Sequence, residues 1–391
     1  MKIVHICITY LDDFHYQEND LSRAHAEMGH TVTMISTQDY AGATAFIMAK
    51  EPPRSSRPYY IDNVKIIRLP IRYNVNYRIA TLKDLYKTIE MENPEIIFFH
   101  AGASCNLPMI AKYKRMHPDC FLGIDFHSDY YNSATNTFSY FYHKYFFRYI
   151  LKLCFKYVDN AYVITPLVGD FVQEIYNLPS HKLKLLPMGA DVSLIDFAHK
   201  DLIRSAIRKK YKIDKEDIII ITGGKLDHNK KTVNLVNAFK AITNRNLHLI
   251  VFGSADEDYK KELTAVIADH PRVHYTGWLS AKEIFDLYLT SDIACFPGGQ
   301  SVLWQHAICC GLPIIIKYLK GLEYLDLGGN VCFLNSDDTE CIKETLEGII
   351  ESPSVLELMA RTARSRGTDF FSYRNIAQTI IDDANQSLKK I

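Results

Sequence analysis

Short apolar runs alternate with longer helix-like stretches along this chain of 391 residues, and the whole alternation occurs twice. The strand-like runs of the first series are residues 3–9, 31–36, 64–69, 95–100, 121–126 and 161–164. Those of the second series are residues 218–222, 247–252, 273–275, 293–296, 313–316 and 331–334. Such alternation predicts parallel sheets flanked by helices. The chain is therefore predicted to form two Rossmann-like α/β domains, with a boundary between Leu185 and Ile213.

In open α/β sheets, ligands bind beyond the carboxyl ends of the strands. With two such domains, we expect the binding site in a cleft between them.

One segment of the second series indicates the kind of ligand. The sequence GGKLDHNKK, residues 223–231, follows an apolar run and precedes a predicted helix over residues 232–242. We expect a strand, a glycine turn and a helix start here. Glycines allow close approach of the backbone, and a helix N-terminus favours an anion. Lys225 and Lys230 add two cations, so the segment predicts a phosphate-bearing ligand. The alternative is a tight turn with solvated lysines.

Composition and a few local patterns indicate which partners and which cellular compartment to expect. Basic and acidic residues balance at 45 each, so no global field favours nucleic acid, and we expect no nucleic-acid partner. The first seven residues, MKIVHIC, resemble a strand rather than a signal peptide, and no apolar run approaches the ~20 residues that span a bilayer. The nine cysteines include no C-x-x-C pair. These features predict a cytoplasmic protein with reduced thiols.

Several short motifs occur in an order and spacing that identify a family. They are residues 29–32 (GHTV), 93–97 (NPEII), 159–164 (DNAYVI), 186–191 (LPMGAD), 224–230 (GKLDHNK), 273–279 (VHYTGWL) and 307–313 (AICCGLP). Over nearly its whole length the chain resembles the retaining glycosyltransferases of family 4, which have the GT-B fold of two Rossmann-like domains with parallel sheets facing across a cleft. Residues 16–19 (YQEN) and 301–305 (SVLWQ) resemble a subgroup found among capsule and surface-polysaccharide enzymes.

The resemblance implies a division of labour between the domains. Residues 1–195 would form the acceptor domain, with a C-terminal helix over residues 372–391 packing back on it. Residues 196–371 would form the domain that binds the nucleotide-sugar donor.

The resemblance also implies catalytic roles. Lys225 and Lys230 match the family's Arg and Lys, which bind the donor diphosphate and stabilise charge on the departing group. Because Lys225 replaces an arginine, the charge is kept and bidentate contact is lost. His127 follows a predicted strand and matches a family histidine near the donor sugar. The alternative for His127 is a hydrogen-bonded turn histidine. With cations and a helix dipole facing the diphosphate, we expect neither a metal site nor a resident cofactor.

Further binding residues are implied in the same way. Gly277 and Trp278 fall where the family's backbone reads the nucleotide base, although Trp278 is also compatible with an ordinary core position. The implied donor-binding residues are Gly224, Gly277, Trp278, Gly298, Gly299, Gln300, Ser301, Val302, Gln305 and His306. The implied acceptor-binding residues are Asp13, Tyr16, Gln17, Glu18 and Asp129.

The chain departs from the family pattern at two positions. Most members carry two glutamates eight positions apart before the C-G-x-P stretch, one for the donor sugar and one for the ribose hydroxyls. The aligned residues here are Gly298 and His306, neither of which is acidic. His306 or Gln305 can offer a hydrogen bond to ribose. The missing glutamates put catalytic competence, or the usual hexose recognition, in question.

One stretch lies outside these motifs. Residues 138–157 are dense in aromatics, and Lys144, Arg148, Lys152 and Lys156 recur every four residues, which on a helix makes one basic stripe. One interpretation is a solvated face over an aromatic core. The other is peripheral docking on an anionic membrane, which would suit a lipid-linked sugar acceptor.

Three functions remain open at this level. The first is a retaining, metal-independent transfer of sugar from a nucleotide donor, expected to be UDP-linked, to a glycan or lipid-linked acceptor. The second is a catalytically silent relative that acts as a binding partner, which the missing glutamates motivate. The third is a nucleotide-sugar epimerase using Asp12, Asp13, Glu18 and His127.

Overall fold

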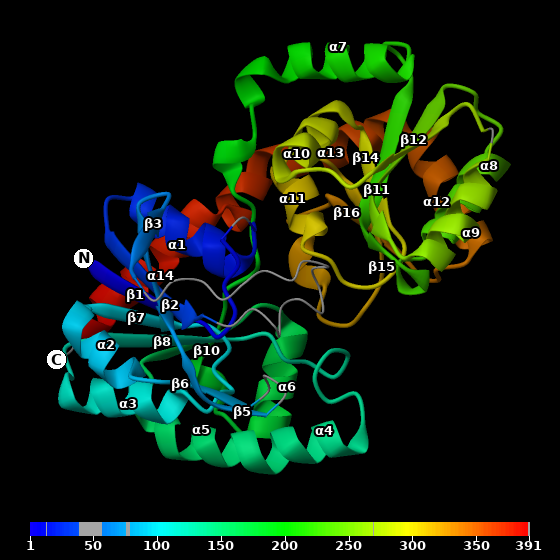
Figure 1. The fold of residues 1–391 in the computed structure, drawn as a ribbon. Coiled ribbons are helices and arrows are strands. Elements are labelled where there is room, and N and C mark those ends of the chain that lie inside the picture. Colours follow the sequence, from blue (N-terminus) through cyan, green and yellow to red (C-terminus); the bar gives the residue numbers. More distant parts are fainter. Residues whose placement is uncertain (13, 39–56, 76–78, 269, 390–391) are drawn as a thin grey trace. The chain divides into compact units, whose positions relative to one another are not determined.

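A computed structural model describes residues 1–391 except residues 13, 39–56, 76–78, 269 and 390–391. The chain divides into two compact units (Figure 1). The first consists of Met1–Pro187 together with Tyr373–Ile391, and the second of Met188–Ser372. The structure thus places the division at Met188, and the sequence places it between Leu185 and Ile213.

The first unit is built on a sheet whose strands are ordered β10-β9-β8-β7-β1-β2-β4-β3. All neighbours pair in parallel except β3 and β4. The strands are β1 (Lys2–Ile6), β2 (Thr31–Thr37), β3 (Tyr59–Ile61), β4 (Val64–Leu69), β7 (Ile96–Phe99), β8 (Phe121–Phe126), β9 (Asn160–Val163) and β10 (Leu183–Leu185). A separate antiparallel pair is formed by β5 (Ile71–Val75) and β6 (Ile79–Leu82).

Helices cover both faces of this sheet. They are α1 (Gln17–Glu27), α2 (Leu85–Glu92), α3 (Leu107–Met116), α4 (Thr137–Phe141), α5 (Arg148–Cys154), α6 (Pro166–Tyr176) and α14 (Tyr373–Leu388). Successive strand residues point to opposite faces. Val4 and Ile6 of β1 pack into a core with α2, α3, α5 and α6, whereas Ile3 packs into a second core with α1 and α14.

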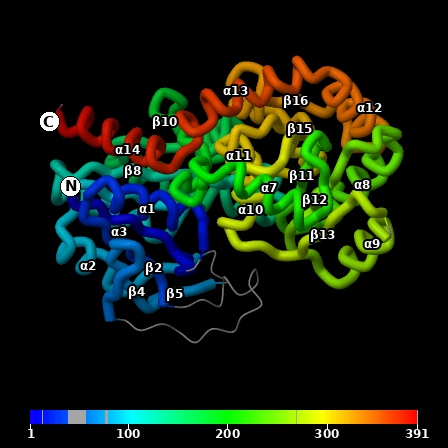
Figure 2. Tube along the Cα trace, turned by 90° about the horizontal axis from the view of Figure 1, so that it is seen from above, coloured from blue at the N-terminus to red at the C-terminus, as the bar shows by residue number. Residues whose placement is uncertain are grey.

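The C-terminal helix α14 therefore belongs to the first unit (Figure 2). Ile376 and Ile380 pack into the core shared with α1 and β1. Asp383 accepts a hydrogen bond of 2.8 Å from the Tyr162 hydroxyl on β9 and pairs with Lys184 on β10 at 2.5 Å. Apolar packing and these buried polar contacts hold the last helix against the sheet.

The second unit contains an entirely parallel sheet with the order β13-β12-β11-β14-β15-β16. Its strands are β11 (Ile218–Leu226), β12 (Leu247–Ala255), β13 (Val273–Gly277), β14 (Ile293–Phe296), β15 (Ile314–Lys317) and β16 (Val331–Leu334). Its helices are α7 (Lys200–Tyr211), α8 (Thr232–Ala241), α9 (Glu257–Ile267), α10 (Ala281–Thr290), α11 (Leu303–Cys309), α12 (Thr339–Ile350) and α13 (Pro353–Phe371). One core includes residues of α10, α11 and α13, and the other includes residues of α8, α9 and α12.

Short helical turns complete both units. They are the π-helical turn η1 (Tyr142–Phe147) and the 3-10 turns η2 (Phe155–Tyr157), η3 (Ser180–Lys182), η4 (Val192–Leu194), η5 (Phe197–His199), η6 (His228–Lys230) and η7 (Glu323–Leu325). Within the described residues, no helix combines the length and the apolar character that crossing a membrane requires.

The predicted α/β fold with two parallel sheets is confirmed, and every predicted apolar run overlaps a strand. One local prediction was wrong. Gly223 and Gly224 were expected in a turn after the strand, but β11 continues through both to Leu226. The strand continues because Gly224 pairs in register with Gly253 of β12, and both adopt a φ of +121° that an L side chain rarely tolerates.

Candidate functional site

A pocket of the first unit opens where β1, β7 and β8 end, and Glu18 of α1 also lines it. Its volume is about 320 Å³, and it is lined by Cys7, Ile8, Thr9, Glu18, His100, Ala101, Ala103, Ser104 and His127. The carboxyl ends of neighbouring parallel strands meet at one edge of a sheet, and this brings together residues that are far apart in sequence. Of the predicted site residues, the pocket contains Glu18 and His127.

His127 is anchored by a buried carboxylate. Its Nε2 lies 3.3 Å from Oδ2 of Asp125, and the same oxygen lies 3.1 Å from Nδ1 of His100. The other carboxylate oxygen accepts a hydrogen bond of 2.7 Å from the amide of Ala101, whose φ of +61° is left-handed. Because Nε2 of His127 is used by Asp125, Nδ1 is the ring nitrogen left for a ligand. The His127 side chain is 34% exposed.

The charges of this cluster support one another. Burial by itself raises the pKa of the Asp125 carboxyl, but the adjacent His127 and His100 outweigh it and hold that pKa well below its usual range. Burial by itself lowers the pKa of His127, but Asp125 outweighs it and raises that pKa. Burial raises the pKa of Glu18, and His100 and His127 oppose that rise. The pocket thus combines a carboxylate-anchored imidazole with a second acid whose proton is held more tightly than usual.

The remaining residues of the first loop differ in their surroundings. Gln17 begins α1 and is buried, and neither of its amide atoms has a hydrogen-bond partner among the described residues. Tyr16 is exposed and stacks on Phe14. Asp13 lies outside the described residues. Gln17 therefore has an unused donor and acceptor, a feature typical of polar ligand recognition.

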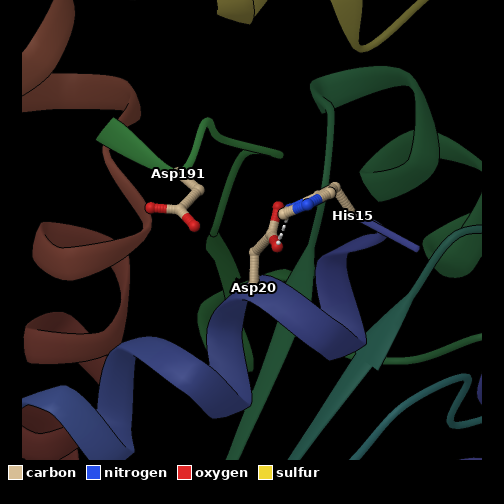
Figure 3. A group of neighbouring side chains, drawn as sticks. All are labelled: His15, Asp20 and Asp191. Atoms are coloured by element: carbon tan, nitrogen blue, oxygen red, sulfur yellow. Dashed lines mark hydrogen bonds and ion pairs between the residues drawn. The ribbon is translucent and has the colours of Figure 1, made fainter. Parts of the chain in front are cut away.

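Contacts to the Asp20 carboxylate fix the start of α1. His15 Nδ1 lies 2.9 Å from Oδ1 of Asp20 (Figure 3). Arg23 contacts the same oxygen at 3.0 Å. Asp191, also drawn there, belongs to the second unit. The His15–Asp20 contact ties the loop before α1 to the helix that carries Gln17 and Glu18.

Two acidic residues that the sequence analysis named as site candidates make structural contacts within the first unit. Asp12 is buried and pairs with Arg68 at 2.5 Å, and the Tyr59 hydroxyl donates to it at 2.9 Å. Asp129 is also buried, and its Oδ1 accepts the amides of Tyr131 and Asn132 at 2.8 Å each. Asp12 therefore neutralises a buried arginine, and Asp129 shapes the loop after β8.

The second unit has a pocket of its own at the ends of β11, β12 and β13, with a volume of about 170 Å³. It is lined by Gly224, Lys225, Phe252, Gly253, Ser254, Trp278, Leu279, Ile284 and Leu303. Trp278 is not a core residue, since 74% of it is exposed. An exposed indole beside glycine backbone provides a flat apolar surface on which a planar ring can stack.

Glycines make this pocket open. A Cβ on Gly253 would collide with the Gly224 backbone, so the two strands can lie side by side only without side chains here. Gly277, with a φ of +75°, ends β13 immediately before Trp278. Backbone amides and carbonyls therefore lie close to any ligand in the pocket.

Lys230 supports a loop rather than pointing freely into solvent. Its Nζ donates to the carbonyl oxygens of Gly299 at 3.0 Å and Gln300 at 2.6 Å. Burial lowers the pKa of Lys230, and Asp227 partly opposes this. Asp227 also caps the η6 turn by accepting the amides of Asn229 and Lys230. The predicted phosphate-binding lysine is thus positioned together with the predicted donor-binding loop.

The loop itself packs tightly against η6. A Cβ on Gly298 would collide with the backbone of Asn229 and Lys230, whereas one on Gly299 would be 3.9 Å from the nearest atom. Ser301 accepts the amide of Leu303 at 3.3 Å, and Val302 precedes α11. A glutamate at position 298 is therefore incompatible with this backbone arrangement.

Two further predicted donor residues are buried on α11. Gln305 donates from Nε2 to the Tyr324 hydroxyl at 2.9 Å, and its Oε1 has no hydrogen-bond partner among the described residues. The His306 ring lies 5.3 Å from the Phe285 ring. Of the predicted donor residues, Gly224, Lys225 and Trp278 line the pocket described above. The predicted residues that do not line it are Gly277, Lys230, Gly298, Gly299, Gln300, Ser301, Val302, Gln305 and His306, although their neighbour Leu303 does.

The sequence interpretation missed several pocket residues. In the first unit these include His100, together with Asp125, which lies behind the pocket and contacts His100 and His127, and in the second unit they include Gly253 and Ser254. A signal was present: Asp125 interrupts an apolar strand and His100 follows one, and a polar group in a buried strand requires a partner. Neither residue belongs to a short motif, so only the fold reveals the pairing.

Two glycosyltransferase family models match the chain, one in each half. A family model described as Glycosyltransferase Family 4 matches residues 19–194, and one described as Glycosyl transferases group 1 matches residues 203–366. The chain is 21% identical over 232 residues to an uncharacterized glycosyltransferase of Methanocaldococcus jannaschii, covering 57% of this chain. The chain spans 60% of the length of that curated relative.

Solved structures share the fold over the full length. A glycosyltransferase from Rickettsia africae has a TM-score of 0.71 at 14% identity, covering 100% of this chain and 99% of that one. Anabaena HepE in complex with UDP has a TM-score of 0.70 at 16% identity, covering 99% of this chain and 100% of that one. At such low identity these likenesses establish the fold alone.

Proposed function

The chain belongs to the family-4 type of glycosyltransferases with the GT-B fold, and we propose that it transfers a sugar from a UDP-linked donor to a glycan or lipid-linked acceptor. The observation that carries this proposal is the pocket of the second unit, where exposed Trp278 stands beside the glycine backbone of Gly224 and Gly253. A flat aromatic surface next to backbone amides suits a nucleotide base. The UDP bound to Anabaena HepE, which shares the fold, supports the choice of nucleotide.

The lysines of the second unit provide the charge that a diphosphate needs. Lys225 lines the pocket, and Lys230 lies in the η6 turn that follows β11. Positive charge held near the diphosphate stabilises it as it leaves the sugar. Because Lys230 also donates to two carbonyls of the loop from Gly298 to Ser301, donor binding and the position of this loop are coupled.

The chemistry that we propose is transfer with retention of configuration. The acceptor hydroxyl attacks the anomeric carbon on the face from which the diphosphate leaves. The new bond to the acceptor oxygen forms as the bond to the phosphate oxygen breaks, and that phosphate oxygen takes the acceptor proton. The protein contributes positioning and electrostatics, and it requires no covalent nucleophile and no metal.

His127 is the residue of the first unit that we assign to the sugar. Asp125 engages its Nε2, which leaves Nδ1 for a sugar hydroxyl. Glu18 lines the same pocket, and Gln17 precedes it on α1 with two unused amide atoms. We assign Glu18 and Gln17 to the acceptor, since both offer directed hydrogen bonds to hydroxyl groups.

The proposal is tested by a thermal-shift screen of the full chain against UDP, GDP, ADP, CMP and their common sugar conjugates. A ligand that binds the folded state raises Tm by mass action. We expect UDP and one of its sugars to raise Tm, and the shift to shrink in Trp278→Ala. If no nucleotide raises Tm at millimolar concentration, the donor site is absent and the silent, partner-binding alternative is favoured.

A second proposal concerns the surface formed by α4, η1 and α5, for which we propose an anionic lipid bilayer as the partner. The residues that face inward include His143, Phe147 and Leu151. Those that face outward include Phe138, Phe141, Tyr145, Phe146, Tyr149 and Leu153. The simple picture of a solvated face over an aromatic core is therefore incomplete, because most of these aromatics lie outside the core.

Charge accompanies this exposed aromatic surface. Lys144 and Arg148 are half-buried, and Lys152 and Lys156 are exposed along the same stretch. Exposed aromatics interleaved with cations are typical of surfaces that insert into the headgroup region of anionic membranes. A lipid-linked acceptor at the cytoplasmic face of a membrane would be presented to such a surface.

The structure bears differently on the two other functions, the epimerase and the catalytically silent relative. Epimerase chemistry with Asp12 is disfavoured, because Asp12 is buried in its pair with Arg68. The silent alternative keeps its motive, since Gly298 excludes the family's glutamate by geometry. Turnover of a donor, with or without an acceptor, distinguishes the three.

A further inference from the structure

A chain of hydrogen-bonded histidines crosses the interior of the first unit. His25 on α1 has Nε2 3.2 Å from the carbonyl oxygen of Ala377 on α14, and its Nδ1 is 3.0 Å from Nε2 of His5 on β1. Nδ1 of His5 is 3.1 Å from Nε2 of His100, whose Nδ1 is 3.1 Å from Asp125. All three histidines and Asp125 are buried. The chain thus runs from the C-terminal helix to the carboxylate that anchors His127.

Counting protons along this chain gives a definite result. Both ends are acceptors, a carbonyl oxygen at Ala377 and a carboxylate at Asp125. The four contacts between them need four N–H groups, but three neutral imidazoles supply only three. Either one imidazole carries a second proton, or one contact places two acceptors against each other, or Asp125 is itself protonated and donates to His100. The His127 ring and the Ala101 amide, which both lie against the Asp125 oxygens, favour the ionised carboxylate. Leaving a buried group unsatisfied costs about 1–3 kcal/mol.

The position of the fourth proton follows from the neighbouring charges. A charged His25 would be buried at the opposite end of the histidine row from the Asp125 carboxylate. A charged His100 would contact that carboxylate directly. A buried charge is tolerated when it is paired and hydrogen-bonded. Burial also lowers the pKa of His5, and it lowers that of His25 to about 3, so these two rings stay neutral.

We propose that His100 holds the fourth proton as an imidazolium, and that the three-histidine chain makes His100 the positioning residue for Asp125 and His127. His100 then donates from both nitrogens, to His5 and to Asp125. His5 donates to His25, and His25 donates to Ala377. Asp125 stays a carboxylate and engages Nε2–H of His127, so the sugar-facing nitrogen of His127 is Nδ1. This last consequence rests on the proposed function, whereas the protonation of His100 does not.

Other titratable groups lie near this row of histidines. They are Cys7 after β1, Glu18 on α1, His30 before β2, and His127 after β8. The Cys7 thiol is neutral because burial raises its pKa. Glu18 is the other acid near His100, and it stabilises positive charge there whenever it is ionised. The surroundings therefore favour the cation at the His100 end.

The second unit contains a shorter row of hydrogen-bonded histidines, which serves as an internal control. Nε2 of His248 is 3.1 Å from Asp217, and Nδ1 of His248 is 3.1 Å from Nε2 of His274. These two contacts need two N–H groups, which two neutral rings supply. Burial lowers the pKa of His248, and it lowers that of His274 to about 4. The same count thus predicts two neutral imidazoles here.

Nitrogen-15 NMR of the full chain with labelled histidine tests the proposal at pH 7.5. We expect both nitrogens of His100 at the frequency of protonated nitrogen, and one unprotonated nitrogen each in His5, His25, His248 and His274. In His5→Leu the acceptor for His100 Nε2 is lost, so His100 should show an unprotonated Nε2. In His5→Gln, which keeps a donor and an acceptor, both protons should remain.

A neutral His100 in the native chain would overturn the proposal, whatever the variants show. Equal His100 signals in native and His5→Leu protein would also overturn it, because the count requires a difference. The readout needs no substrate turnover. Failure to bind a nucleotide would therefore argue against the proposed function without affecting the protonation of His100.

Discussion

Gly298 lies so close to Asn229 that a Cβ at this position would collide with the Asn229 carbonyl oxygen. The same oxygen accepts the amide of the next residue, Gly299, at 2.9 Å. The position at which most family members carry a glutamate is therefore closed to any side chain here. Loss of the acid is part of how the loop packs on η6, so in the transfer that we propose other groups would recognise the donor sugar.

This packing predicts different outcomes for two adjacent glycines. Gly298→Ala should destabilise the protein by about 1–3 kcal/mol, because the methyl group has no space. Gly299→Ala should change stability little, since its Cβ would be 3.9 Å from the nearest atom. Denaturant unfolding measures both. Equal stability of the two variants would show that the loop is not held against Asn229 as described.

Lys230 should act on donor binding in two ways. Lys230→Ala removes a cation and two hydrogen bonds to loop carbonyls, so we expect the Kd for UDP to rise at least tenfold. Lys240→Ala is the control, because Lys240 also donates to a backbone carbonyl, that of Val266, at 3.0 Å. Calorimetric titration with UDP measures both variants. Unchanged affinity in Lys230→Ala would remove this lysine from the donor site.

Trp278 should contribute to binding without contributing to folding. Stacking of a base on an aromatic side chain is worth about 1–3 kcal/mol. Trp278→Ala should thus weaken UDP binding by roughly 5- to 150-fold. Because 74% of Trp278 is exposed, Tm in the absence of nucleotide should hardly move. Trp278→Phe should retain most of the affinity, and a Trp278→Ala protein that binds UDP normally would refute the stacking role.

The Asp125 cluster predicts a pH dependence of stability. The folded pKa of Asp125 is lowered, so its contribution is present above about pH 3.9, its unfolded value. The folded pKa of His127 is raised, so its contribution is full below about pH 6.5 and is lost as pH rises through the folded value.

The stability lost in Asp125→Asn should therefore be greatest between about pH 4 and 6.5 and should shrink on the alkaline side. Because the His127 side chain is 34% exposed, the loss should be smaller than the about 3–5 kcal/mol of a fully buried pair, but still large enough to change Tm measurably. Thermal unfolding of both proteins from pH 4 to pH 9 provides the test. A difference that grows toward alkaline pH would contradict the assignment of His127.

The membrane proposal predicts lipid-selective binding. Full-length protein should float with vesicles that contain anionic lipid and much less with neutral vesicles. Changing Lys144, Arg148 and Lys152 to glutamine should abolish the difference. A matched variant with Lys209, Lys210 and Lys212 changed to glutamine removes the same charge from the second unit and should float like the native protein. Equal recovery on neutral and anionic vesicles would eliminate this surface as a membrane contact.

The fold was predictable from the sequence because strands covered on both faces are largely apolar, even where one polar residue such as Asp125 interrupts them. Residues 121–126 and 293–296 could be recognised in this way, and they form β8 and β14. The extension of β11 beyond Thr222 could not, because it depends on a second glycine, Gly253, lying opposite Gly224. Glycine is intrinsically unfavourable in a strand. Here the strand continues because of the glycine that faces it on the partner strand, which the local sequence does not reveal.

Some of the residues predicted from the sequence lie at a pocket, and the roles assigned to them stay predictions. His127, Lys225 and Trp278 each line a pocket. The ion pair of Asp12 was not predictable, since its partner Arg68 is 56 residues away in sequence. The histidine chain was equally hidden, because it joins residues from β1, α1 and the end of β7. Such contacts are set by the tertiary packing of distant elements.

The most direct test of the central claim follows the anomeric proton of the donor by NMR, using the UDP-sugar that raises Tm most, with and without a membrane lipid and glycan extract as acceptor. The account predicts release of UDP and a new glycoside with the anomeric configuration of the donor, only when the acceptor is present. Conversion of the donor to an epimer without acceptor would establish the epimerase, and no turnover with any acceptor would establish the silent relative. Either result would contradict the transferase that we propose.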